Sequence, residues 1–203
     1  WRRHAYDVSY THARTLDPVS FRCIPFVAGP LLDSVTVLIA VVDRAIAARA
    51  ENPRYADGAV FHHGAFMLTS LGLRLDAARL AMTQWASTCV ARLVKLHDPA
   101  YTEQARFLAG GPVGSSGTMV LEYTAASALE TVRTLADPTS RHTTSISVGT
   151  EDHASFASRG AMALRESLPA FATVLACELV AAARAVRWEG GVGTGEPAHA
   201  LLD

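Results

Sequence analysis

The sequence has little net charge, a single lysine and few cysteines. Its 203 residues carry 18 basic and 19 acidic side chains, for a formal net charge of -1, and Lys95 is the only lysine. This balance argues against a nucleic-acid or anionic-lipid partner, because such partners require a basic surface. The three cysteines, Cys23, Cys89 and Cys177, are widely spaced and odd in number. They make no metal-binding pattern, fit a reducing cytosol and are predicted to be small buried residues.

Long hydrophobic segments are also scarce. No apolar core follows residues 1–4, so we identify no signal peptide. Residues 35–42 are apolar but are flanked by Asp33 and Asp43, which makes the run too short to span a bilayer and predicts a buried helix. We therefore expect a cytoplasmic protein without a membrane partner. The chain begins with tryptophan rather than methionine, which indicates a fragment or a processed piece.

Helical periodicity is what the chain does have. Half of the residues are apolar and only 18% are charged, which suits a helix-rich protein that buries surface within itself and against other subunits. Apolar residues recur every three or four positions from Leu71 to Leu96, and the pattern ends before Asp98-Pro99. Strand alternation is rare, with residues 145–148 as the only short candidate.

Three more helices are predicted from apolar runs and their breaks. They cover residues 31–50, 118–136 and 154–187. Ser115 and Ser116 are candidate caps for the middle one, and Pro169 is expected to kink or restart the last. The fold class is therefore all-α. We predict a single domain over residues 1–203, a long-helix bundle that forms oligomers, with a loose tail at residues 189–203.

Residues 151–156, Glu-Asp-His-Ala-Ser-Phe, concentrate ionisable groups between Gly149-Thr150 and an alanine-rich helix. Unpaired backbone N–H groups and the positive end of the macrodipole favour acidic side chains at such a position. One interpretation is a capping cluster with Thr150 or Asp152 as the N-cap. The other interpretation is a functional site, which other segments of the chain favour.

Four segments in one order carry a family resemblance. Residues 17–23 (Asp-Pro-Val-Ser-Phe-Arg-Cys), 60–62 (Val-Phe-His), 115–119 (Ser-Ser-Gly-Thr-Met) and 150–155 (Thr-Glu-Asp-His-Ala-Ser) resemble motifs of the histidine and phenylalanine ammonia-lyase family, which includes aminomutases. The resemblance covers nearly the whole chain and corresponds to the C-terminal half of such an enzyme. It implies a long-helix bundle assembled as a homotetramer, with active sites made from several chains.

The resemblance also implies the chemistry. Family members remove ammonia from an α-amino acid or move it to the β-carbon, using the electrophilic prosthetic group 4-methylidene-imidazol-5-one, made from an internal Ala-Ser-Gly. The sequence contains no Ala-Ser-Gly, and Ser115-Ser116-Gly117 is the nearest imitation. By position it matches a different family segment. We therefore expect the prosthetic group to come from an upstream portion that is not present in this chain.

Arg22, Phe61 and Glu151 are the candidate site residues that the resemblance indicates. Arg22 would bind the substrate carboxylate through two parallel hydrogen bonds, and the alternative is a structural ion pair. Phe61 would pack beside the prosthetic group, and the alternative is core packing. Glu151 would face the substrate side chain as in histidine-specific members, which indicates histidine or another polar substrate. His62 and His153 are interpreted as structural, and Asp152 as a helix cap.

Departures from the family pattern keep other functions open. The family has glutamine and tyrosine where this chain has Leu16 and Val19, asparagine at Val60 and Ser115, and glutamine at Thr150. Valine can neither donate a proton nor accept a hydrogen bond through its side chain. The chain is thus one half of a working ammonia-lyase or aminomutase, a catalytically silent scaffold or regulatory subunit, or a helical interaction domain with coincidental motifs.

Overall fold

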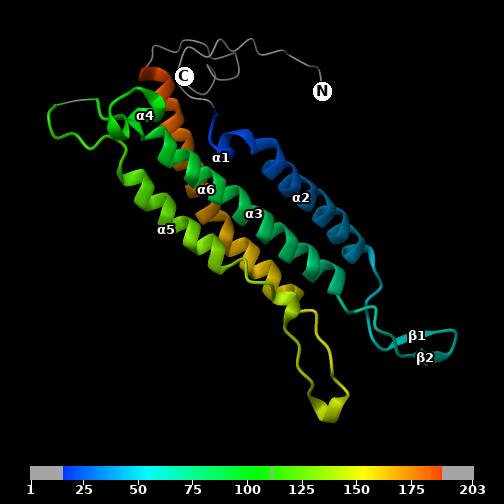
Figure 1. The fold of residues 1–203 in the computed structure, drawn as a ribbon. Helices are drawn as coiled ribbons and strands as arrows, with labels where there is room; N and C mark the ends of the chain where they lie inside the picture. The colour runs from blue at the N-terminus through cyan, green and yellow to red at the C-terminus, as the bar shows by residue number, and fades with distance from the viewer. Residues whose placement is uncertain (1–15, 111, 189–203) are drawn as a thin grey trace, which may run out of the picture.

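The computed structural model describes residues 16–110 and 112–188 as an elongated helical bundle (Figure 1). The predicted all-α fold is confirmed, with one small hairpin in addition. The long helices are α2 (Ile24–Ala47), α3 (Thr69–Leu96), α5 (Val120–Thr134) and α6 (Ala157–Trp188). The short elements are α1 (Val19–Arg22), β1 (Arg54–Ala56), β2 (Ala59–Phe61), α4 (Pro99–Thr102) and the 3-10 turns η1 (Arg106–Leu108), η2 (Thr139–Arg141) and η3 (Ser147–Gly149). The predicted tail at residues 189–203 lies outside the described residues.

α3 is the central helix of the bundle. It packs against α2, α5 and α6, and α5 also packs against α6 (Figure 1). Its buried apolar side chains recur every three or four residues, as the sequence predicted: Leu75, Ala78, Met82, Ala86, Cys89 and Leu93. Two of the three cysteines, Cys89 and Cys177, are buried free thiols in this core, and burial raises the pKa of both. The prediction of small buried cysteines is therefore confirmed for these two, whereas Cys23 is half-buried.

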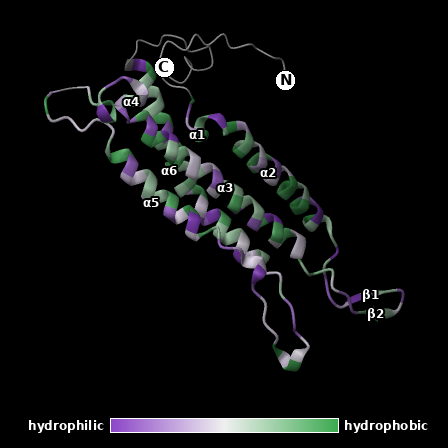
Figure 2. Cartoon of the chain, viewed as in Figure 1, coloured by the Kyte–Doolittle hydropathy of each residue, from purple (hydrophilic) through white to green (hydrophobic). Residues whose placement is uncertain are grey.

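α2 differs from the prediction in both length and burial. It begins at Ile24 and runs through Pro30, and of its described residues only Leu38 and Val41 are buried. The expected buried helix is therefore wrong for this chain by itself, because α2, which is largely apolar (Figure 2), packs mainly on α3 and leaves many of its apolar side chains exposed. Phe26 and Ile46, at its two ends, are 78% and 79% exposed.

α2 and α6 are long and apolar enough to cross a membrane by length and composition. This corrects the expectation that the apolar run in α2 is too short, since the acidic residues that flank it lie within the helix and do not end it. Core helices of soluble proteins pass the same test, so the finding carries little weight on its own.

Several predicted caps are also wrong. Within the described residues no side chain caps α5, and the Ser115 hydroxyl accepts a hydrogen bond from the Gly117 N–H instead, at 3.4 Å. Since α6 begins at Ala157, Thr150 and Asp152 lie too early in the chain to cap it. The same helix runs through Pro169 without restarting.

A β-hairpin between α2 and α3 was not predicted. β1 and β2 pair antiparallel, with Tyr55 opposite Val60. Asp57 and Gly58 form the two-residue turn, and both have positive φ, 51° and 78°, as a type I′ turn requires. Residues 145–148, by contrast, do not form the predicted strand. Of them only Ile146 pairs, in an isolated bridge.

Candidate functional site

Glu151 is presented by a long loop at the end of the bundle where α3 begins (Figure 1). The loop doubles back at η3, where Val148 and Gly149 have positive φ. Its two arms are joined at Ile146 and Glu151, whose backbones exchange N–H to O hydrogen bonds of 2.8 Å and 3.3 Å. Glu151 is exposed. The bridge therefore fixes its backbone while the side chain remains accessible.

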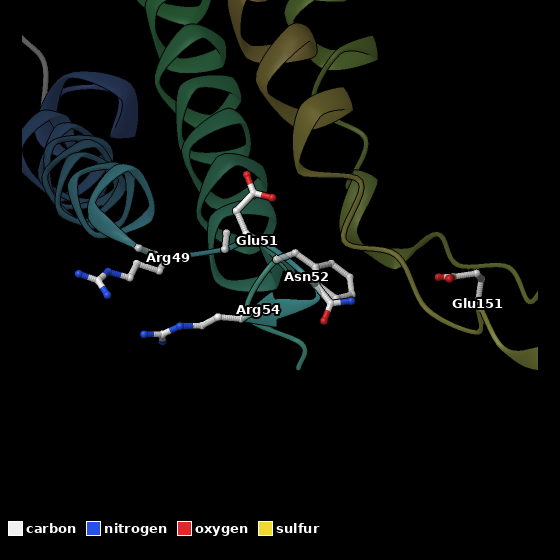
Figure 3. Close-up of a pocket in the computed structure, with 8 residues that line it drawn as sticks. Arg49, Glu51, Asn52, Arg54 and Glu151 are labelled. Atoms are coloured by element: carbon white, nitrogen blue, oxygen red, sulfur yellow. The ribbon is translucent and has the colours of Figure 1, made fainter. Parts of the chain in front are cut away.

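The Glu151 side chain lines an open cleft of about 710 Å³ between this loop and the segment that follows α2. Its other lining residues are Ala48, Arg49, Ala50, Glu51, Asn52, Arg54 and Phe66. Figure 3 shows the Glu151 carboxylate extending toward the Asn52 side of the cleft, whereas the guanidinium groups of Arg49 and Arg54 extend away from it. Asn52 is itself held in place, because its Oδ1 accepts the His63 N–H at 2.9 Å.

Phe61 lies at the same end of the molecule as Glu151. It is the last residue of β2 and pairs with Arg54 of β1, which lines the cleft. Phe61 is 50% exposed, so the alternative that it packs in the core is wrong for this chain. The hairpin therefore brings an exposed aromatic ring next to the cleft that contains Glu151.

The base of the Glu151 loop is fixed to α3 by a buried polar network. The Asp76 carboxylate accepts hydrogen bonds from the backbone N–H groups of Thr139 and Ser140, at 3.1 Å and 2.9 Å, and from the Thr139 hydroxyl at 3.1 Å. Arg79 pairs with Asp76 and donates to the carbonyls of Leu135 and Asp137. This network covers the end of α5 and holds η2 against α3, so it sets where the loop starts.

Asp76 keeps its charge despite burial. Burial by itself would raise the pKa of this carboxyl, but the hydrogen bonds from Ser140 and Thr139 and the positive charge of Arg79 outweigh that effect. The pKa of Asp76 therefore lies below its ordinary value of 3.8. The network is consequently an ionic anchor at neutral pH.

Arg22 lies at the opposite end of the bundle, on the short helix α1 (Figure 1). Its Nε donates to the Asp17 carbonyl at 2.8 Å, and the side chain is exposed. The neighbouring Phe21 ring stacks on Tyr101, with 5.1 Å between ring centroids. α1 packs against the C-terminal part of α3, where the Ser20 carbonyl accepts a hydrogen bond from Arg92.

The predicted site residues are thus not brought together within one chain. Phe61 and Glu151 lie near the start of α3, and Arg22 lies near Arg92, one turn before its end. At 1.5 Å per residue, the stretch of α3 between these points is roughly 35 Å long. An amino acid cannot contact both Arg22 and Glu151 of the same chain.

Ser115-Ser116-Gly117 forms a tight turn at the end of the bundle where α3 ends. Thr118 donates both its N–H and its hydroxyl to the Phe107 carbonyl, each at 2.9 Å, which fixes the turn against η1. Gly117 has φ +55°, and a Cβ there would meet the Phe107 carbonyl oxygen at 2.3 Å. The segment is anchored to His97 at the C-terminal end of α3, far from Phe61 and Glu151.

Sequence reasoning missed most of the cleft. Arg49, Glu51, Asn52, Arg54 and Phe66 line it but belong to none of the quoted motifs. The available signal was Asp57-Gly58, a dipeptide typical of type I′ hairpins, which places the strands before and after it side by side. His153 lies in the Glu151 loop, where its Nδ1 is 3.4 Å from the Thr143 hydroxyl.

Comparisons with known proteins agree with these motifs. The sequence profile described as "Aromatic amino acid lyase" matches residues 4–203. Histidine ammonia-lyase of Geobacillus thermodenitrificans is 32% identical over 179 residues, which is 87% of this chain and 36% of that protein. Histidine ammonia-lyase of Streptomyces coelicolor is 31% identical over 192 residues, or 94% of this chain and 38% of that protein. The chain thus spans little more than a third of the length of these relatives.

Solved structures share the fold. Ergothionase from Treponema denticola, in complex with desmethyl-ergothioneine sulfonic acid, has a TM-score of 0.85 and 26% identity, covering 96% of this chain and 39% of that one. Phenylalanine aminomutase from Pantoea agglomerans has a TM-score of 0.84 and 25% identity, covering 92% and 37%. The matched profile and these relatives establish the point that the motifs predicted: the chain belongs to the aromatic amino acid lyase family.

Proposed function

We propose that this chain forms one part of an ammonia-lyase or aminomutase that acts on a histidine-like or aromatic α-amino acid. The observation that carries the proposal is the separation of Arg22 from Phe61 and Glu151 along α3. All three side chains are exposed, and all three lie within the residues that the family profile matches. Arg22 would bind the substrate carboxylate, and Glu151 would face the substrate side chain. Because they lie at opposite ends of α3, they can contact the same substrate only if they come from different chains.

Each residue has a role that its chemistry supports. Arg22 binds the substrate carboxylate, because a guanidinium donates two parallel hydrogen bonds to it. Glu151 pairs with a polar substrate side chain such as an imidazole, and Phe61 packs beside the reacting centre. The 4-methylidene-imidazol-5-one group, which would supply the electrophile, comes from a portion with an Ala-Ser-Gly that is not present in this chain.

The assembly is proposed to be an oligomer, most simply a homotetramer, that includes the upstream portion. Outward apolar residues at several positions along α2 support this: Phe26, Leu32, Ile39 and Ile46 are all more than half exposed. A surface of this kind is buried against another chain in most soluble assemblies. We further propose a cytoplasmic protein with neither nucleic acid nor membrane as partner.

Two residues, Leu16 and Val19, support a second function, that of a catalytically silent subunit. Leu16 and Val19 stand where the family has glutamine and tyrosine, and both are exposed, 65% and 64%. Neither side chain can move a proton or hydrogen-bond a substrate. A catalytically silent scaffold or regulatory subunit is therefore the alternative. The third hypothesis, a helical domain with coincidental motifs, is wrong because residues 4–203 match the family profile.

The test measures activity with and without the upstream portion. Purified by itself, the chain is expected to release no ammonia from histidine, tyrosine or phenylalanine and to show no absorbance from the prosthetic group. Together with an Ala-Ser-Gly-bearing portion, it is expected to release ammonia or form a β-amino acid. Activity of the isolated chain would contradict the proposal, and an inactive complete assembly would favour the silent subunit.

A further inference from the structure

Arg92 makes more directed contacts than stability alone explains. It is 3% exposed on α3, and its Nε and Nη2 form a forked pair with Glu178 of α6. Its Nη1 reaches in another direction and donates to the Ser20 carbonyl of α1 at 3.0 Å. The Trp85 ring lies beneath the guanidinium, 5.0 Å from its carbon to the ring centroid. One side chain therefore connects α3, α6 and α1.

Glu178 stabilises the positive charge of the buried Arg92 side chain. Burial by itself would lower the pKa of the guanidinium, but the hydrogen bonds and negative charge of Glu178 outweigh this and raise it. A buried ion pair nevertheless stabilises a fold weakly, because desolvation cancels most of its attraction, and apolar residues of similar volume often do as well. The pair is therefore better explained by the hydrogen bond that Arg92 Nη1 donates to the Ser20 carbonyl of α1.

That donor binds α1, a short helix that Cys23 separates from α2. α1 has only four residues, fewer than a stable isolated helix needs, and within residues 16–110 no side chain caps its N-terminus. The Val19 carbonyl accepts the Cys23 N–H at 2.8 Å, and the helix then breaks at Cys23, before α2 begins. The Ser20 carbonyl, two residues before Arg22, receives the Arg92 N–H instead. Stacking of Phe21 on Tyr101 fixes the adjacent residue.

We propose that Arg92, oriented by Glu178, is a positioning residue for Arg22. It fixes the backbone of α1 so that the exposed guanidinium of Arg22 points in one direction before the substrate carboxylate arrives. Lysine cannot replace it, because a single ammonium cannot both fork onto Glu178 and reach the Ser20 carbonyl. This inference rests on the proposed role of Arg22 in substrate binding.

The experiment compares Arg92→Lys and Glu178→Gln with Val174→Ala in the complete enzyme. Val174 is buried in the core on α6, one turn before Glu178, and its truncation lowers stability without removing a contact to α1. The two readouts are steady-state kinetics and the labelling rate of Cys23, followed by peptide mass spectrometry. Cys23 is a suitable reporter because it is half-buried and directly follows α1.

We expect Arg92→Lys to raise KM by on the order of ten- to a hundredfold with a much smaller change in kcat, since misplacing a binding group by about 1 Å has effects of this size. Labelling of Cys23 should accelerate several-fold in Arg92→Lys and less in Glu178→Gln. Val174→Ala should lower the melting temperature and leave both KM and Cys23 labelling unchanged.

The outcomes separate this inference from the proposed function. If Arg92→Lys behaves like Val174→Ala in both readouts, Arg92 is a structural residue and the inference is overturned. If Arg22→Ala leaves KM unchanged, the role of Arg22 itself fails. In that case Cys23 labelling still decides whether Arg92 fixes α1.

Discussion

At both ends of α3, a buried arginine of this helix binds the backbone of a surface segment, but the acidic partner of the arginine differs. At each end an exposed side chain that we propose to bind substrate lies on a short or irregular segment, a long loop for Glu151 and a four-residue helix for Arg22. At each end a buried arginine of α3 holds that segment by its backbone carbonyls. Arg79 is 2% exposed and Arg92 is 3% exposed.

The difference lies in the acid that orients each arginine. Asp76 is three residues before Arg79 on the same helix, and its carboxylate also binds η2 directly. Glu178 approaches Arg92 from α6, so this pair also joins two helices. The Glu151 end is therefore anchored by a carboxylate and an arginine acting together, whereas at the Arg22 end Arg92 supplies one N–H beside the stacking of Phe21 on Tyr101.

The largest effect is expected from Asp76→Asn, which breaks the anchor at the Glu151 end. Removing the charge leaves Arg79 buried without its ionic partner, which costs about 3–5 kcal/mol of unfolding free energy. Chemical denaturation of the variant and the parent measures this difference. If the unfolding free energy falls by less than about 1 kcal/mol, the value typical of an exposed ion pair, the network does not anchor the loop.

The same variant has a defined pH dependence. The pKa of Asp76 lies below its ordinary value of 3.8, so the stability that its charge contributes is fully present above that value. The contribution is lost as the pH falls through the folded-state pKa. The stability difference between parent and Asp76→Asn should therefore be constant at neutral pH and shrink below about pH 4. If the stability difference between the parent and Asp76→Asn grew as the pH fell, Asp76 would not act as a charged anchor.

The next effect is expected at the Arg22 end. In the complete enzyme, Arg22→Ala should weaken substrate capture by about 2–5 kcal/mol, because the carboxylate loses a charge-assisted pair. Arg22→Lys should restore only part of it, since the fork is lost. The value of kcat/KM measures both variants. Equal kinetics for parent and Arg22→Ala would show that Arg22 does not bind substrate.

A smaller effect is expected from Glu151→Gln, which changes the group proposed to face the substrate side chain. Preference should move from histidine toward tyrosine and phenylalanine by about 1–3 kcal/mol in relative kcat/KM, with little change in melting temperature because Glu151 is exposed. Relative rates on the three amino acids measure it. A lower melting temperature with unchanged relative rates would indicate a structural residue.

The smallest effect is expected away from both ends. Glu130 and Arg133 form an exposed ion pair on α5, with side chains 67% and 48% exposed. Glu130→Ala should change the unfolding free energy by less than about 1 kcal/mol and leave kinetics unchanged, since solvent screens such pairs. A larger loss in the same denaturation assay would mean that surface pairs, and not the buried arginines, dominate the comparison.

The apolar periodicity of the sequence predicted the central helix α3 well, but it predicted the burial of α2 and the helix caps less well. The apolar spacing from Leu71 to Leu96 was enough for α3, because burial on one face repeats with the helical turn. α2 was misjudged, since an apolar run looks the same whether it is covered by its own chain or by another. The caps were misplaced because the loop before α6 is longer than the local pattern indicated.

The sequence motifs nominate the candidate site residues individually but do not predict their arrangement. Motifs identified Arg22 and Glu151, and no local pattern could show that α3 separates them. Arg92 and Asp76 escaped notice for a different reason. Each is a charged residue in an apolar stripe, and only the tertiary structure brings Glu178 or Thr139 to it.

The most direct test of the account mixes two defective chains. Arg22→Ala and Glu151→Ala, each in the complete enzyme, are expected to have low turnover on histidine. If the site takes Arg22 and Glu151 from different chains, mixed oligomers contain sites with both residues intact, and about a quarter of the parental turnover should return on random mixing. If turnover stays at the level of the separate variants in oligomers that are demonstrably mixed, both residues act within one chain or not at all, and the account is wrong.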